Sequence, residues 1–157
     1  MASKSALVGI SGVYYVAADL SQLGYIATVT SRNAQGVDIF VSSSDGLKSV
    51  SIQVKTSGAE QRKRFTRSWR MDKKHENLYS DSFFYVFVDL HEGNSKPDYY
   101  VVPSKVVAEY VRTSHAKWLQ TPSKSGKIHE DHPHRLYEIY DDKIAEKYKD
   151  AWHLLGL

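Results

Sequence analysis

The sequence predicts an α/β protein in which a mixed β-sheet is flanked by helices, in the order helix, three strands, and later a further strand and helix. Three patterns support this fold class. Residues 6–23 repeat apolar side chains at helical spacing, residues 36–57 read as a hairpin, and residues 82–90 (SFFYVFVDL) form a continuous apolar run. Such a run is typical of a central strand covered on both faces. The 157 residues show no internal repeat and no linker, so we predict one domain over 1–157.

The first helix and the strand after it are predicted from periodicity. The helix over 6–23 has one apolar stripe, and Gly24 follows where a C-terminal cap would fall. The stripe comprises Ile10, Val13, Ala17, Leu20 and Leu23. Residues 25–30 (YIATVT) are rich in β-branched side chains, which predicts a strand that leads into the hairpin.

The hairpin is the feature around which we expect the rest of the chain to be organised. Its alternating runs flank Asp45-Gly46, a pair typical of a two-residue type I′ loop. In that register, residues whose numbers sum to 91 lie opposite each other, and one face is apolar. The apolar face comprises Val37, Ile39, Val41, Val50, Ile52 and Val54. On the other face, Asp38 lies opposite Gln53 and has Lys55 as its diagonal neighbour.

The rest of the chain alternates strands and helices. Residues 98–102 predict a strand that Pro103 stops, and Ser104 is a plausible N-cap for a helix to about Leu119. We expect that helix to bury Val106, Val107, Tyr110 and Val111. Residues 121–133 form the least ordered segment, and 136–140 predict a short strand. Asp141 then caps a last helix that buries Ile144, Tyr148, Trp152 and Leu155.

The polar side chains of the hairpin have two interpretations. Asp38 and Lys55 could be an ordinary surface pair on a half-exposed sheet, which is the default for a polar outer face. Alternatively, a carboxylate, an amide oxygen and an ammonium converge to bind a ligand. Asp38 followed by Gln53-Val54-Lys55 at the end of a strand resembles the Asp…(Asp/Glu)-x-Lys signature of the PD-(D/E)XK nuclease superfamily, in its Gln-x-Lys variant. The stretches around it, from GVYYVAADLSQLGYIATVTSRNAQGVDIFV to YYVVPSKVVAEY, are similar to bacterial domains of that superfamily.

The resemblance implies a restriction-endonuclease-like core and a DNA endonuclease that needs Mg²⁺ or Mn²⁺. It implies that Asp38, Gln53 and Lys55 are catalytic, and that Asp38, Gln53 and the backbone carbonyl of Val54 bind the metal. Such an enzyme could be of restriction, homing or junction-resolving type, and could act on two strands as a homodimer. The sequence departs from the superfamily in one respect: Val13 stands where many members have a metal-binding glutamate, with Asp19 as a possible substitute. The alternative is therefore an inactive nuclease-like fold that binds nucleic acid or a protein.

A basic segment with interleaved aromatic residues follows the hairpin at 60–76. Its alternation predicts a strand or extended arm with Phe65, Arg67 and Trp69 on one side. Cations along a strand can follow a phosphate backbone while aromatic rings stack on bases. The candidate nucleic-acid contacts are Arg62, Lys63, Arg64, Arg67, Trp69 and Arg70. The alternative is a solvated face over a core tryptophan.

Composition bounds the remaining possibilities. The net charge of +3 is mild, and no stretch approaches the length of a membrane span or a signal peptide, so we expect a cytoplasmic protein without a membrane partner. The chain has no cysteine, which excludes disulfides and thiolate metal sites. His129, His132 and His134 suggest zinc, but their spacing matches no closed structural site. The favoured interpretations are a mobile surface loop, or an edge that faces phosphate when the histidines are protonated.

Overall fold

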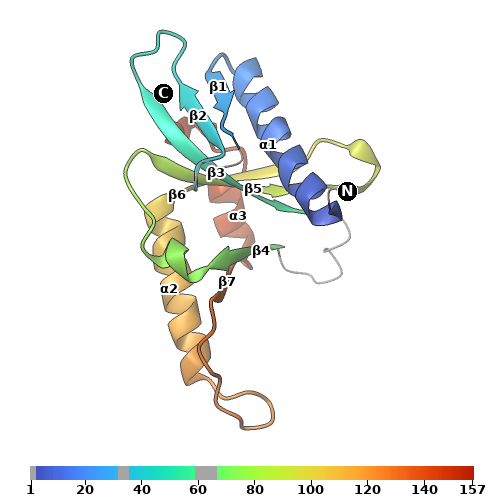
Figure 1. The fold of residues 1–157 in the computed structure, drawn as a ribbon, viewed down its shortest axis with the longest axis vertical. Coiled ribbons are helices and arrows are strands. Elements are labelled where there is room, and N and C mark those ends of the chain that lie inside the picture. The colour runs from blue at the N-terminus through green and yellow to red at the C-terminus, as the bar shows by residue number, and fades with distance from the viewer. Residues whose placement is uncertain (1–2, 32–35, 59–66) are drawn as a thin grey trace.

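The structure is a computed structural model that describes residues 3–31, 36–58 and 67–157 (Figure 1). Helix α1 (Lys4–Gln22) is followed by strands β1 (Ile26–Val29), β2 (Ile39–Ser42), β3 (Ser49–Ser57) and β4 (Arg67–Asp72). Next come the 3₁₀ helix η2 (Lys73–Glu76), β5 (Phe83–Asp89), the 3₁₀ helix η3 (Glu92–Asn94) and β6 (Asp98–Pro103). The order ends with α2 (Ser104–Gln120), β7 (His134–Ile139), α3 (Asp142–Tyr148) and the 3₁₀ helix η4 (Trp152–Leu155).

Five of these strands form one mixed sheet in the order β1-β2-β3-β5-β6. β1, β2 and β3 are successive antiparallel neighbours, β3 runs parallel to β5, and β6 is antiparallel to β5. All seven residues of β5 are buried, as predicted for a central strand covered on both faces. A mixed sheet flanked by helices, entered through one helix and three strands, confirms the predicted fold class.

Helix α1 covers one face of the sheet and encloses the first part of the core. Val13, Val16 and Leu20 pack there against the even-numbered side chains of β5. Gly12 lets the helix approach β3 closely, because a Cβ atom at Gly12 would lie 2.0 Å from Oγ1 of Thr56. The predicted stripe is correct for Val13 and Leu20, omits Val16 and wrongly includes Leu23, which is 52% exposed.

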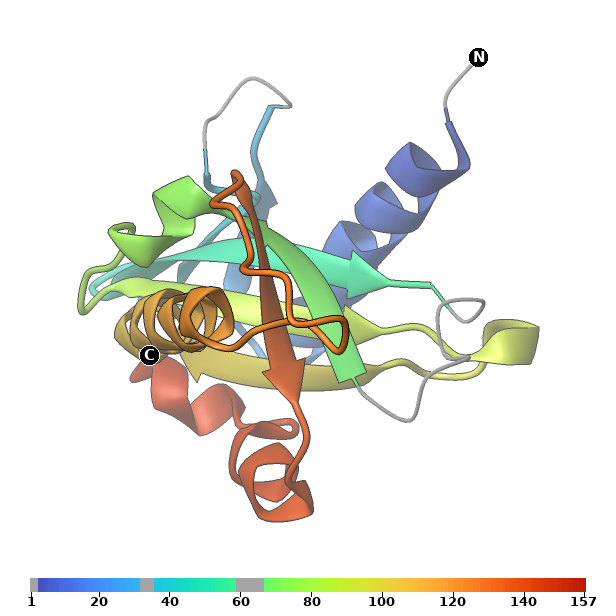
Figure 2. The same ribbon diagram turned by 90° about the horizontal axis from the view of Figure 1, so that it is seen from below.

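The opposite face of the sheet carries a second layer. Strands β4 and β7 pair antiparallel as a separate two-stranded sheet, and Figure 2 shows them crossing the five-stranded sheet on the side away from α1. Trp69 and Met71 of β4 pack against the odd-numbered side chains of β5, and α2 and α3 close the cluster with Val107, Val111 and Tyr148. This second layer covers the sheet face to which the polar residues of β3 belong.

Two helix predictions need correction. Ser104 is not a cap but the first residue of α2, where its buried hydroxyl accepts from the Ser80 N–H at 3.1 Å and donates to the Ser80 carbonyl at 3.0 Å. Val106 and Ile144, predicted to be buried, are 37% and 46% exposed. The next residue in each helix, Val107 and Ala145, faces the core instead. The Asp141 cap is confirmed, since its side chain accepts from the Lys143 N–H, but the helix ends at Tyr148, and Trp152 and Leu155 lie in η4.

No helix within the described ranges is both long and apolar enough to cross a lipid bilayer.

Candidate active site

The predicted register of the hairpin is confirmed, but its loop differs. The ladder runs from Ile39↔Ile52 to Ser42↔Ser49, the pairs that the sequence predicted. The connection is wider than a two-residue turn, because the Ser43 N–H donates to the Lys48 carbonyl at 3.0 Å and the Gly46 N–H to the Ser43 carbonyl at 2.9 Å. A type I′ loop would need a positive φ at Asp45, and only Gly46 has one there. The register is the predicted one because the loop spans residues 44–47 instead of 45–46, one residue more on each side, so the same residues still face each other.

Ladder pairing between β2 and β3 stops just before Asp38. The Asp38 N–H donates to the Ile52 carbonyl at 2.8 Å, and its carboxylate Oδ2 accepts from the Val54 N–H at 2.7 Å. The carboxylate thus takes the place of a backbone acceptor at the end of the ladder, and Asp38 is not a ladder partner of Gln53. Val37 is a second correction, because it packs against the cluster around Trp69 rather than on the α1 face.

Gln53 and Lys55 project from β3 toward the second layer. In the parallel ladder they are paired with Tyr85 and Phe87, which belong to the core cluster on that face. Gln53 is 9% exposed, and its Oε1 has no hydrogen-bond partner among the described residues. A buried acceptor without a partner is costly, so it is expected to meet a water, an ion or a ligand.

Burial and opposite charges shape the electrostatics of this site. Burial raises the pKa of Asp38, while the Val54 N–H and the Lys55 ammonium oppose that shift. Burial likewise lowers the pKa of Lys55, against the attraction of Asp72 and Asp38. A carboxylate and an ammonium whose pKa values are shifted toward neutrality by burial are typical of functional sites.

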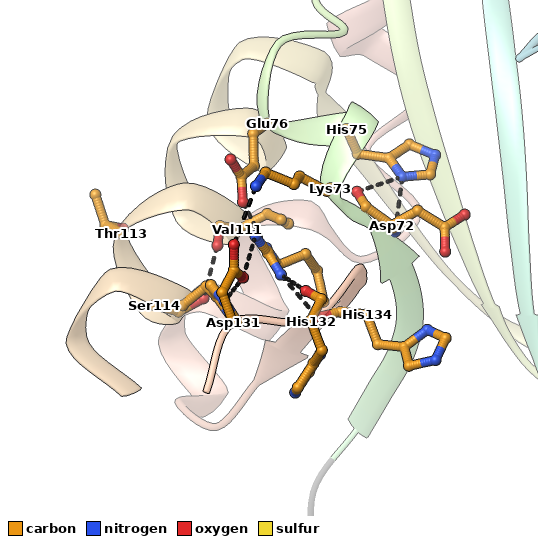
Figure 3. Close-up of polar contacts among 12 residues, drawn as sticks. Asp72, Lys73, His75, Glu76, Val111, Thr113, Ser114, Asp131, His132 and His134 are labelled. Carbon is orange, nitrogen blue, oxygen red and sulfur yellow. Dashed lines mark hydrogen bonds and ion pairs between the residues drawn. The ribbon is translucent and has the colours of Figure 1, made fainter. Parts of the chain in front are cut away.

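The structure adds His75 and Tyr85, which sequence reasoning missed. His75 is fully buried, and its Nδ1 lies 2.9 Å from the Asp72 backbone nitrogen and 3.0 Å from the Asp72 carbonyl (Figure 3). Its ring packs edge-on to Tyr85 at 5.9 Å, and burial together with Lys55 lowers the His75 pKa to about 4. Neither His75 Nε2 nor Tyr85 Oη has a partner within the described part of the chain. The only local signal in the sequence is the Asp72-to-His75 spacing, which matches a capping box.

Neither Val13 nor Asp19, the two α1 residues that relate to the superfamily's metal-binding glutamate, lies on the sheet face of Gln53 and Lys55. Val13 is 7% exposed and belongs to the core under α1. Asp19 forms an ion pair with Lys96 at 2.9 Å. Burial, together with the Asp19 charge, raises the pKa of Tyr99, whose side chain packs in the core on the α1 face of the sheet. The prediction of Asp19 as a substitute for the glutamate is therefore wrong.

The predicted nucleic-acid contacts divide into three groups. Trp69 is a core residue, 3% exposed, whose Nε1 donates to the Val88 carbonyl at 3.0 Å, so its assignment as a contact is wrong. Arg67 lies 3.5 Å from Asp142 and over the Tyr100 ring, whereas Arg70 is exposed and contacts His134. Residues 62–65, which include the predicted contacts Arg62, Lys63 and Arg64, lie outside the described residues.

The histidine-rich segment before β7 forms a ring cluster. His129 stacks on Trp118 at a centroid distance of 3.9 Å, and His132 lies edge-on to the same ring at 5.1 Å. No group of three or more His, Asp or Glu side chains that could hold a metal occurs in residues 3–31, 36–58 or 67–157.

Comparison with known proteins identifies a similar fold. No protein-family model and no curated protein sequence matches the chain. Among solved structures, the chain is similar to a bacterial homing endonuclease, I-Ssp6803I, with a TM-score of 0.60 and 15% sequence identity. The match covers 98% of this chain and 95% of the other. The chain therefore has a nuclease-like α/β fold.

Proposed function

We propose that the protein is a Mg²⁺-dependent DNA endonuclease of the PD-(D/E)XK type, in which Asp38, Gln53 and Lys55 form the active site. The observation that carries the proposal is the unpaired, buried Oε1 of Gln53 on the sheet face where Asp38 and Lys55 interact. The shared fold with a homing endonuclease supports DNA as the substrate.

The residues at the end of the β2–β3 ladder suit a hard divalent cation. Asp38 offers a carboxylate and Gln53 a neutral amide oxygen, both of the oxygen chemistry that Mg²⁺ prefers. Within a strand, the N–H and C=O of one residue point toward the same edge. Since the Val54 N–H points to Asp38, the Val54 carbonyl lies on the Asp38 side as well. These three groups are the proposed ligands.

A bound Mg²⁺ would act as a Lewis acid on the scissile phosphate and lower the pKa of a bound water. The protein's own contribution is positioning and charge. Lys55 lies near Asp38 and Asp72, which favour its ammonium form against burial, so it can stabilise negative charge that grows on the phosphate. With Gln53 in place of a second carboxylate and Val13 in place of a glutamate, only Asp38 contributes formal negative charge to the proposed ligand set. We therefore expect weak metal affinity until the substrate phosphate adds its own charge.

His75 and Tyr85 form the buried surroundings of the Gln53 side chain. Gln53 is the ladder neighbour of Tyr85, and the Tyr85 ring contacts His75. Buried water could satisfy the unpaired atoms Gln53 Oε1, Tyr85 Oη and His75 Nε2, because buried waters bind polar groups that lack a partner in the protein. We assign His75 and Tyr85 as positioning residues that hold the Gln53 amide.

The second candidate function is an inactive nuclease-like module that binds nucleic acid. The observation that favours it is Val13, which is built into the apolar core where a metal-binding glutamate would be expected.

Cleavage of supercoiled plasmid in Mg²⁺, Mn²⁺ or EDTA separates the two candidates. We expect the wild type to nick DNA only with metal, and Asp38→Asn and Lys55→Met to reduce the rate at least 100-fold while retaining DNA binding. Asp45→Asn and Lys48→Met are matched controls in the exposed hairpin loop of the same element. Cleavage that survives both site substitutions refutes the active-site assignment, and wild-type binding without cleavage establishes the second candidate.

A further inference from the structure

We propose that a groove between α2, β4 and β7 binds the sugar-phosphate backbone of the nucleic acid beside the reaction site. This inference rests on the proposed function and extends it to a second contact surface. The groove has a volume of about 560 Å³, which lies within the range of ligand sites in proteins. Its principal lining residues are Arg70, His115, Trp118, His132, His134 and Leu136.

The floor of the groove is the outward face of the two-stranded sheet. Arg70 is the ladder partner of Leu136, and both side chains are exposed because their neighbours Trp69 and Tyr137 point into the core. The opposite wall comes from α2, which presents Ser114, His115 and Trp118.

An ion network centred on the buried Arg135 lies beside the groove. Arg135 is 4% exposed and binds Glu76, Asp131 and the His132 carbonyl. Asp131 also accepts from Lys73 at 3.0 Å and from His115 at 2.9 Å. Figure 3 shows Lys73, Glu76 and Asp131 of this network close together, with the His134 ring turned away from them. The carboxylates of Glu76 and Asp131 are thus already engaged in ion pairs.

The cationic groups that face the groove are not balanced in the same way. Arg70 makes no ion pair with a carboxylate of the described residues, and its Nη2 instead lies 2.7 Å from the His134 Nδ1. In this contact the guanidinium donates and the imidazole nitrogen accepts, and the remaining N–H groups of Arg70 can bind a phosphate oxygen. Glu138, the one carboxylate of the lining, follows Leu136 by two residues along β7, where its ladder partner is Ser68.

Flat rings form the rest of the surface. Trp118 stacks with His115 at a centroid distance of 5.3 Å and with His129 at 3.9 Å, and Leu136 in the same lining is 49% exposed. Ring edges and an exposed leucine provide apolar contact for a sugar, while Arg70 and His134 bind the phosphate. This combination is typical of proteins that follow a nucleic-acid strand.

The location of the groove favours a nucleic acid over another anion. His134 is the ladder partner of Asp72, and Asp72 acts electrostatically on Lys55. Asp72 is the last residue of β4, so a strand whose scissile phosphate lies at Lys55 has to pass around that end of β4 to reach Arg70 and His134 on its outward face.

Binding and labelling experiments test this proposal on the full chain. Fluorescence anisotropy with labelled duplex and single-stranded DNA, in Ca²⁺ rather than Mg²⁺, should show at least 10-fold weaker binding for Arg70→Ala/His134→Ala. The negative slope of the logarithm of the association constant against the logarithm of the salt concentration should become shallower by about 1. Arg112→Ala, an exposed arginine of α2 outside the groove, should bind like the wild type.

Because the chain lacks cysteine, Leu136→Cys introduces a single thiol into the groove. DNA should protect it from alkylation, whereas Ile144→Cys on α3, a site of similar exposure, should stay reactive. Unchanged affinity and an unprotected thiol in a protein that cleaves DNA would overturn the groove proposal alone. Protection by polyglutamate but not by DNA would also overturn it. A wild type that neither binds nor cleaves DNA would refute the groove and the proposed function together.

Discussion

Acid should destabilise this protein through one buried imidazole, that of His75. The side chain has no exposed surface, and burial together with the Lys55 charge lowers its pKa to about 4, from about 6.5 in the unfolded chain. Below pH 6.5 the unfolded state therefore binds a proton that the folded state does not bind until about pH 4. The stability attributable to neutral His75 is complete above pH 6.5 and is lost as the pH falls toward 4.

The magnitude follows from the difference between the two pKa values. A difference of one pKa unit corresponds to about 1.4 kcal/mol, so His75 lowers the free energy of unfolding by about 2 kcal/mol at pH 5 and about 3 kcal/mol at pH 4, relative to pH 7. Such a loss is a large part of the roughly 5–15 kcal/mol that stabilises a typical domain.

Urea unfolding between pH 4 and pH 7 measures this effect. His75→Asn keeps an acceptor for the Asp72 N–H but removes the titrating group, so its stability should fall by about 2 kcal/mol less than that of the wild type between pH 7 and pH 5. The smaller side chain also changes the free energy of unfolding by an amount that is the same at every pH, which does not affect the comparison between pH 7 and pH 5. His153→Asn, at an exposed position, is the matched control. Parallel profiles for the wild type and His75→Asn would refute the reasoning.

Three further predictions concern packing and the candidate site. Gly12→Ala should destabilise by about 2–4 kcal/mol because its Cβ would meet Thr56, and Gly9→Ala, in open space on the same helix, should be neutral or stabilising in thermal unfolding. Trp69→Phe should cost about 1–3 kcal/mol, because it leaves a buried β5 carbonyl without its donor, and should leave DNA affinity unchanged in anisotropy; a selective loss of binding would contradict its place in the core. Gln53→Glu should lower the Mg²⁺ concentration needed for half-maximal cleavage, because a second carboxylate strengthens binding of a hard cation; an unchanged metal requirement would exclude Gln53 as a ligand.

Local patterns in the sequence were sufficient for most of the elements. The register of the hairpin was correct although the loop was not, because an even-length loop of either size leaves the same residues opposite each other. The apolar run at 82–90 identified β5, since its length suits a strand and residues 83–88 carry no charged side chain, which is typical of a strand with both faces covered.

Nothing local indicated how the carboxylate of Asp38 would end the ladder. Its bond to the Val54 N–H depends on a break in the β2–β3 pairing, which is a property of two strands and not of one. The same break sends Val37 to the face opposite the one that its alternation predicted.

By itself, the sequence determined which residues alternate, and hence that Gln53 and Lys55 share a face of β3. Only the tertiary structure decided what covers that face. Period-two alternation defines two sides of a strand but does not state which side meets another layer. The segment after the hairpin shows the consequence: Trp69 is packed into the core and Arg70 is exposed because β4 lies across β5, a contact between residues far apart in the chain. That same packing brings His75 against the Tyr85 ring and within electrostatic reach of Lys55, a juxtaposition that no spacing in the sequence indicates.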